Sequence, residues 1–389
     1  MSTVIDPRAA RLRDRLRGAL VAAAATPMTR SGEVDPDLAE RYYRRLVATG
    51  ADALAVLAHT GRGPYLPPEV RRELIVRARR AGVPVVVGVG GSPAAPSGTA
   101  PHPRAAQAPG PTPREGTGIG PDLAPDSATG QEPGPTPGEG ANRKSGAVSH
   151  SGVGRGSDPG LWESAGGAGP REGMDRATPP AAGEGAVERT VADARMAAEL
   201  GADGILVFPS PGDRLAENDA VWQATGLPMI AFDLYTAPCP PAVLTEILRH
   251  PGVAGLKTAL LSDAMGCQAT IAMTRQAGRL AITGEDRMFG PSLLWGAEAA
   301  LVGIAAASVE ATAAVMRAFE GDDLRAFDKA SARLDRLATA TFTAPMEGYV
   351  QRMLWLAAAE GLIPESHAHD PFGPDLPETE RAAVLAASA

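Results

Sequence analysis

The chain has 389 residues, of which 44% are hydrophobic and 21% are charged, a globular composition that can bury a sizeable core. A formal charge of −8 without any block of Lys and Arg argues against nucleic acid or an anionic membrane surface as the main partner. Cys239 and Cys267 are too few for a disulfide framework and lack zinc-site spacing, so we expect a cytoplasmic protein that binds a small molecule.

The N-terminal segment has two interpretations. An Arg-rich stretch from Arg8 to Arg17 runs into the apolar residues 19–25, which imitates a secretory signal peptide. Asp6 and Asp14 interrupt the basic stretch, and a buried strand explains the short apolar run as well. No stretch approaches the roughly 20 apolar residues that a membrane-spanning helix requires, so we expect no membrane partner.

One unit recurs along the chain: an amphipathic helix, a turn that contains glycine, and a short aliphatic strand. Once one long insertion is subtracted, the turns follow one another at intervals of roughly 20 to 30 residues, the length of a βα unit. Continuous apolar runs are typical of parallel strands covered by helices on the outside. The eight predicted strands are residues 20–25, 53–57, 85–89, 204–207, 229–232, 253–257, 280–283 and 300–304.

Eight βα units favour the α/β class and a closed (β/α)8 TIM barrel over an open doubly wound sheet. Further helices are predicted at about 308–319, 323–342 and 346–362, with a short one from Pro377. The domain boundaries that we predict are therefore a first part of the barrel over residues 1–91, a second part over 186–307, and a C-terminal helical region over 308–389.

Residues 92–185, which follow the third strand, are rich in Pro, Gly, Ser and Thr and contain almost no large aliphatic side chains. Such a segment cannot offset its ordering entropy by burial. We therefore predict a disordered insertion, whose two ends emerge at the same face of the barrel as the active site.

Lys257 is the first candidate for chemistry, because it ends a predicted strand and reactive residues of barrels lie at the C-terminal ends of strands. The chain has three lysines against 34 arginines, and Lys257 has apolar neighbours on both sides. Desolvation there lowers the pKa of an ammonium group and leaves a neutral amine that can attack a carbonyl. The alternative is a lysine that extends to solvent from the end of a strand.

A second group follows the second strand. Backbone N–H groups in the turn His59, Thr60, Gly61, together with the Thr60 hydroxyl, can hold a carboxylate. His59 is a candidate base or carboxylate partner, or else a structurally satisfied histidine. Glu285 and Asp286, after the seventh strand, either line the mouth of the pocket or form a solvated turn. No spacing of His, Asp or Glu indicates a metal site.

These segments together resemble the dihydrodipicolinate synthase and N-acetylneuraminate lyase family of class I aldolase-like barrels. The stretches "ALVAAAATPMTRSGEVD" and "GADALAVLAHTGRGPYLPPEVRREL" are similar to its first two βα units, and "VPVVVGVGG", "AELGADGILVFPSP" and "LPMIAFDLYTAP" to strands three to five. "GVAGLKTAL" and "ITGEDRMFGPSLLWGAEAALVGIAA" match its Schiff-base strand and the units after it. The resemblance implies a Schiff base between Lys257 and pyruvate or a related 2-oxo acid, without a cofactor, in a homo-oligomer that is a tetramer or a dimer.

The chain also departs from the family pattern. His59 replaces one Thr of the family's turn, so only Thr60 and Gly61 carry over as contacts to the substrate carboxylate. The family's catalytic Tyr falls on Phe232, which can line the substrate site but cannot relay a proton, so Tyr235 or His59 is the candidate proton shuttle. No arginine follows "FDLYTAP", where lysine-biosynthesis enzymes of the family bind their second substrate. That absence argues against dihydrodipicolinate synthase activity itself.

The sequence therefore predicts a Schiff-base-forming lyase, either an aldolase or a dehydratase. One alternative is a barrel that lost efficient catalysis with the tyrosine and serves as a binding or regulatory protein. A third hypothesis, an open-sheet nucleotide enzyme, lacks any dinucleotide-binding fingerprint in the sequence.

Overall fold

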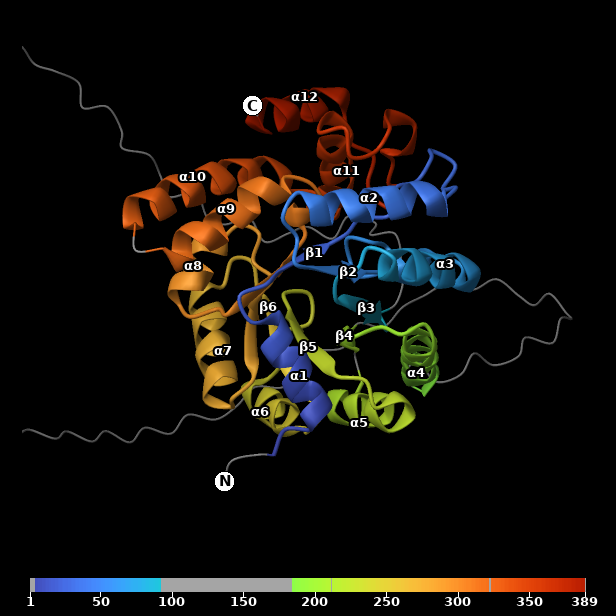
Figure 1. Ribbon diagram of the computed structural model, residues 1–389, viewed down its shortest axis with the longest axis vertical. Helices are drawn as coiled ribbons and strands as arrows, with labels where there is room; N and C mark the ends of the chain where they lie inside the picture. Colours follow the sequence, from blue (N-terminus) through green and yellow to red (C-terminus); the bar gives the residue numbers. More distant parts are fainter. Residues whose placement is uncertain (1–3, 92–183, 211, 322, 389) are drawn as a thin grey trace, which may run out of the picture. The chain divides into compact units, whose positions relative to one another are not determined.

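A computed structural model describes residues 4–91, 184–210, 212–321 and 323–388 of the chain. Eight parallel strands close into one barrel in the order β1 to β8, and the pairing of Leu20 with Ala300 joins β1 to β8. Figure 1 shows this barrel with helices around it. The strands are β1 (Leu20–Ala23), β2 (Ala53–Val56), β3 (Val85–Val89), β4 (Gly204–Val207), β5 (Met229–Leu234), β6 (Val253–Ala259), β7 (Leu280–Thr283) and β8 (Ala299–Val302). The predicted (β/α)8 barrel is confirmed.

Helices connect the strands and cover the outside of the barrel (Figure 1). They are α2 (Pro36–Ala48), α3 (Pro68–Arg79), α4 (Glu184–Glu199), α5 (Arg214–Thr225), α6 (Pro241–Arg249), α7 (Ala264–Gln276), α8 (Phe289–Leu294) and α9 (Val309–Glu320). Short 3-10 helices are η1 (Gly63–Tyr65), η2 (Ile304–Ala306), η3 (Met346–Gly348) and η4 (Glu365–His367). The segment that we predict to be a disordered insertion lies outside the described residues, except for its last two, with which α4 begins.

The helix after β1 illustrates how local sequence sets these boundaries. The Asp35 side chain accepts hydrogen bonds from the backbone N–H groups of Asp37 and Leu38, and Pro36 occupies the first helical position. Gly50 follows the end of this helix with a φ of +117°, which a residue with a side chain rarely adopts. The sequence therefore specifies both ends of α2.

The C-terminal helical region consists of α10 (Leu324–Thr341), α11 (Tyr349–Ala359) and α12 (Glu378–Ser388), as the sequence predicted. Helix α10 packs against α8 and α9, and α12 packs against α10 and α11. Helix α11 contacts the preceding η3 and also η2, which follows β8. The C-terminal region thus reaches the end of the barrel at which the strands terminate, and this contact shapes the site.

Helix α1 (Pro7–Leu16) was not predicted. Its apolar side chains Ala9, Leu12 and Leu16 belong to the cluster of buried residues that fills the inside of the barrel. A methyl group on Gly204, at the start of β4, would collide with Leu12, so the helix packs directly on the barrel backbone. The Arg-rich start of the chain is therefore an amphipathic helix. No helix in the described part of the chain is long and apolar enough to cross a membrane.

If α1 is an integral part of the barrel, Leu12→Ala should lower the free energy of unfolding by about 2–4 kcal/mol, because it leaves a cavity in the core. The matched control is Arg11→Ala on the exposed side of the same helix, with an expected change within about 0.5 kcal/mol. Urea unfolding followed by circular dichroism measures both. Equal midpoints for the two variants would show that α1 contributes nothing to the folded barrel.

Candidate active site

Lys257 lies inside the barrel, near the end of β6. Its Cα is paired with that of Phe232 in β5, and its Nζ lies 4.3 Å from the centre of the Phe232 ring. On the other side is Gly284, which directly follows β7; a methyl group at this position would overlap the Lys257 side chain. The lysine is therefore held between an aromatic ring and a glycine, with only 7% of its surface exposed.

Burial in this position changes the acid-base behaviour of the amine. It lowers the pKa of Lys257 to about 8, although the nearby carboxylates of Asp286 and Glu285 favour the charged form. No hydrogen bond joins the Lys257 Nζ to another residue of the described part of the chain. A substantial neutral fraction near physiological pH follows, as the sequence hypothesis requires.

Glu285 and Asp286 are both buried, so the interpretation of this pair as a solvated turn is wrong. The Glu285 carboxylate accepts hydrogen bonds from the backbone N–H groups of Leu260 and Leu261, which follow β6. Asp286 accepts one from the N–H of Ile304, at 2.7 Å. Burial raises the pKa of both carboxyl groups, that of Asp286 to about 7, against the opposing effect of Lys257. Two buried carboxyl groups in the loop after β7 thus favour the charged form of Lys257.

The turn after β2 places Thr60 at the same end of the barrel. Leu57 begins the turn with a φ of +58°, and Gly63 leaves room for its carbonyl group. The Gly61 carbonyl accepts a hydrogen bond from Thr26 Oγ1 at 2.7 Å, and the Gly61 N–H donates to the Ala58 carbonyl. Of the two predicted carboxylate contacts, Gly61 therefore has its N–H engaged within the turn, whereas Thr60 carries a hydroxyl group toward the site.

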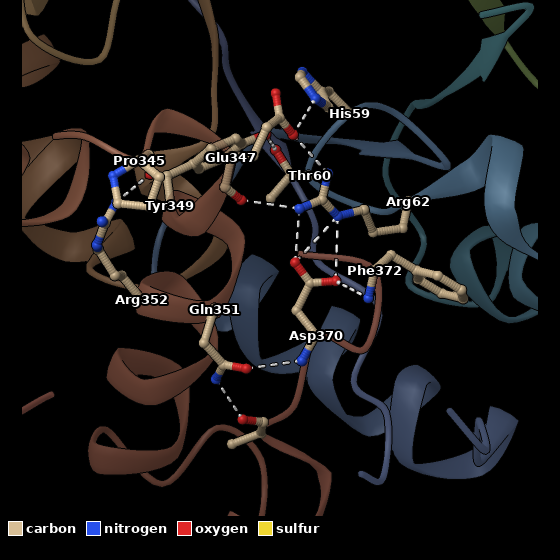
Figure 2. Close-up of polar contacts among 11 residues, drawn as sticks. His59, Thr60, Arg62, Pro345, Glu347, Tyr349, Gln351, Arg352, Asp370 and Phe372 are labelled. Carbon is tan, nitrogen blue, oxygen red and sulfur yellow. Dashed lines mark hydrogen bonds and ion pairs between the residues drawn. The ribbon is translucent and has the colours of Figure 1, made fainter. Parts of the chain in front are cut away.

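Tyr349 is a site residue that the sequence analysis missed. Its hydroxyl lies 3.1 Å from Thr60 Oγ1 (Figure 2). Its ring stacks on Phe342 at a centroid distance of 4.9 Å. Burial raises its pKa far above the ordinary range, and the nearby Asp286 carboxyl group acts in the same direction. A protonated tyrosine hydroxyl from the C-terminal region thus faces the turn that carries the predicted substrate contacts.

Arg62 fixes the C-terminal region to the barrel. This residue is 1% exposed and adopts a left-handed φ of +53°. Its guanidinium donates to Asp370 Oδ2 at 2.7 Å, to Glu347 Oε2 at 2.8 Å and to the Glu347 carbonyl at 2.9 Å (Figure 2). Gln351 of α11 accepts from the Asp370 N–H and so holds that carboxylate in place. A buried cation of this kind needs several partners, which here come from segments far away in the sequence.

His59 and Tyr235, the two predicted proton shuttles, both contact Glu347. His59 Nε2 lies 3.1 Å from Glu347 Oε2, and the Tyr235 hydroxyl is hydrogen-bonded to the same carboxylate. Burial and the Glu347 charge raise the pKa of Tyr235 to about 12. Burial acts to raise the pKa of Glu347. Hydrogen bonds from His59 and Arg62 to its carboxylate outweigh this effect and lower the pKa to about 2. Glu347 is therefore an anion that joins both candidate shuttles.

A pocket of about 230 Å³ lies beside this group. Phe208 lines it and packs edge-on against Phe232 at a centroid distance of 5.4 Å. Phe232 in turn faces Lys257, so the rings of Phe208 and Phe232 link the pocket to the amine. The predicted site residues thus fall into three groups. Lys257 faces Phe232, Thr60 is hydrogen-bonded to Tyr349, which was not predicted, and His59 and Tyr235 both contact Glu347. Among the described residues, no three His, Cys, Asp or Glu side chains are placed to hold a metal ion.

No family model matches the chain. The 4-hydroxy-tetrahydrodipicolinate synthase of Bifidobacterium animalis subsp. lactis is 38% identical over 74 residues, which are 19% of this chain and 24% of that protein.

Solved structures with a similar fold include the dihydrodipicolinate synthases from Bacillus clausii and Thermotoga maritima. The Bacillus clausii enzyme has a TM-score of 0.65 at 11% identity, over 97% of this chain and 98% of that one. The Thermotoga maritima enzyme has a TM-score of 0.64 at 17% identity, over 96% of this chain and 97% of that one. The N-acetylneuraminate lyase from Mycoplasma synoviae has a TM-score of 0.61 at 14% identity, over 96% of this chain and 98% of that one. These likenesses confirm the predicted resemblance, and at such identities they show a common fold.

The pKa of Lys257 can be measured by the pH dependence of its acetylation with acetic anhydride, with the exposed Lys329 as internal reference for the reagent. We expect half-maximal reactivity near pH 8. Asp286→Asn removes a charge that favours the ammonium form, so it should lower this midpoint by roughly one unit. Asp375→Asn, at an exposed position, should leave it unchanged. A midpoint near the ordinary value of 10.5 in the unmodified protein would contradict the described burial of the amine.

Proposed function

We propose that this chain is a Schiff-base-forming lyase of the class I aldolase type, an aldolase or dehydratase, which acts on pyruvate or a related small 2-oxo acid. The observation that carries the proposal is the buried Lys257 amine on β6, with a pKa lowered to about 8 and an aromatic ring at 4.3 Å. The relatives support it, because one is named as a dihydrodipicolinate synthase and another as an N-acetylneuraminate lyase. A cytoplasmic location and a homo-oligomer stay predictions from the sequence.

In the proposed first step, the neutral Lys257 amine attacks the keto carbon, and a C–N bond forms as the carbonyl π electrons move to oxygen. Transfer of the amine proton to that oxygen gives a carbinolamine, and a further proton allows water to leave and the iminium ion to form. The iminium then serves as an electron sink for the cleavage of an adjacent C–C bond, or for loss of a proton from the neighbouring carbon. Elimination of water from a hydroxylated substrate uses the same sink.

Each neighbouring group has a proposed part in this chemistry. The Thr60 hydroxyl binds the carboxylate of the 2-oxo acid, and the face of Phe232 lies against the developing iminium charge. Tyr349, which is hydrogen-bonded to Thr60 and near Asp286, is placed to pass protons to and from the carbinolamine oxygen. Tyr235 and His59 contact Glu347 instead, so a proton route through them leads by way of that carboxylate.

The hypothesis of a binding or regulatory protein rests on the replacement of the family's tyrosine by Phe232. The buried hydroxyl of Tyr349 weakens that argument, because it supplies from another segment the kind of group that Phe232 lacks.

Borohydride reduction in the presence of pyruvate should attach the 2-oxo acid to Lys257, which peptide mass mapping can locate. Lys257→Met should abolish the adduct, while Lys329→Met, at an exposed position, should leave it intact. A panel of 2-oxo acids that leaves the Lys257 peptide unmodified would defeat the proposal.

Tyr349→Phe should slow adduct formation at saturating pyruvate by about 10²-fold, the usual contribution of one proton-transfer group. Tyr43→Phe removes another fully buried phenol hydroxyl and is the matched control, with little expected change. Tyr235→Phe should also have a small effect on this step. If Tyr349→Phe forms the adduct as fast as the Tyr43→Phe control, then Tyr349 has a purely structural role.

A further inference from the structure

The pocket above Lys257 has mostly apolar walls. They are formed by Pro64, Tyr65, Phe208, Pro209 and Leu234. The Tyr65 ring is itself held in place by stacking on Phe372, at a centroid distance of 4.9 Å. A flat or apolar group of a second reactant can therefore pack in this space, next to the place where the 2-oxo acid is bound in our proposal.

The polar side of the same pocket carries no free cation among its described residues. Arg62 lines it, but the guanidinium donates to the carboxylates of Asp370 and Glu347 and to the backbone carbonyl of Glu347. His59 is likewise paired with Glu347. Asp370 does not line the pocket, so the charged side chains of its wall are Arg62 and Glu347, with His59 beside them. Because the Arg62 side chain is only 1% exposed, a carboxylate that enters the pocket meets the negative charge of Glu347.

The Glu347 carboxylate itself is open to the pocket, with 41% of its side chain exposed. It occupies the charged donors of Arg62 and His59, with which a second carboxylate would pair, and it repels such a group as well. A hydroxyl group or an uncharged carbonyl compound meets neither obstacle, because a hydroxyl can donate to Glu347.

We propose that the second substrate is an uncharged aldehyde with an apolar or aromatic group, and that Glu347 is the residue that excludes anionic aldehydes. The inference rests on the proposed function, since it concerns the reactant that joins the Lys257 adduct. In the synthetic direction, the adduct loses a proton from its methyl carbon to give an enamine. That carbon forms a bond to the aldehyde carbon, the aldehyde oxygen takes up the proton, and water hydrolyses the product from Lys257.

A matched pair of aldehydes tests the proposal: benzaldehyde and 4-carboxybenzaldehyde, each supplied with pyruvate to the full-length protein. We expect benzaldehyde to be condensed with a kcat/KM at least about tenfold higher, given one repulsive charge in a partly buried site. Glu347→Gln should reduce this ratio by about tenfold, because it removes the charge and releases donors of Arg62 and His59. Glu347→Asp keeps the charge and should retain the preference.

Glu365→Gln, an exposed carboxylate elsewhere in the C-terminal region, is the control and should leave the ratio unchanged. The rate of borohydride trapping of pyruvate is measured for each variant in parallel, which separates this inference from the proposed function. Trapping on Lys257 with equal use of the two aldehydes, or with a ratio that Glu347→Gln does not alter, overturns the role of Glu347. Loss of trapping in the unmodified protein would instead overturn the Schiff base on which the inference rests.

Discussion

One physical constraint governs the site: the amino group of Lys257 is buried at the mouth of a closed barrel. Removal from water disfavours the charged form of Lys257, whereas the carboxyl groups of Glu285 and Asp286 favour it. The balance leaves the pKa at about 8, between that of an ordinary lysine and that of a fully isolated buried amine. Phe232 and Gly284 hold the Lys257 side chain inside the barrel, and neither has a side-chain oxygen or nitrogen that could accept a hydrogen bond from the ammonium group.

The second feature of the site is its construction from two distant parts of the chain. Arg62, in the loop after β2, is surrounded by oxygens from Glu347 and Asp370, so the C-terminal region is attached at the mouth of the barrel (Figure 2). This attachment brings the Tyr349 hydroxyl to Thr60. The same ion pairs that fix the fold locally therefore also position a proton donor and place an anion beside the pocket.

The fold was predictable because it depends on short-range patterns. Apolar strands, caps such as Asp35 with Pro36, and glycines at turns recur with every βα unit, and each can be recognised within a few residues. Lys257 could be singled out as a candidate for the same reason, since a lone lysine at the end of an apolar strand is a local signal. Helix α1 was missed because its many arginines mask the spacing of Leu12 and Leu16, which are the residues that pack on the barrel.

The missed part of the site depends on long-range pairing. Glu347 and Tyr349 lie within a segment whose local sequence pattern indicates only a helix. No neighbouring residue in the sequence indicates that they contact the turn at residues 59–62. The burial of Asp286 was equally hidden, because an acidic pair after a strand has the same local pattern whether it is solvated or enclosed. The hydrogen bond between Tyr235 and Glu347 could not be foreseen either, because the two residues are far apart in the sequence.

The proposed reaction requires Lys257 to capture a 2-oxo acid whose carboxylate lies at Thr60. A crystal structure of the protein after borohydride reduction with pyruvate would show both contacts at once. We expect continuous electron density from Lys257 Nζ to the former keto carbon, with the carboxylate within hydrogen-bond distance of Thr60 Oγ1. An unmodified Lys257, or an adduct whose carboxylate points away from Thr60, would contradict it.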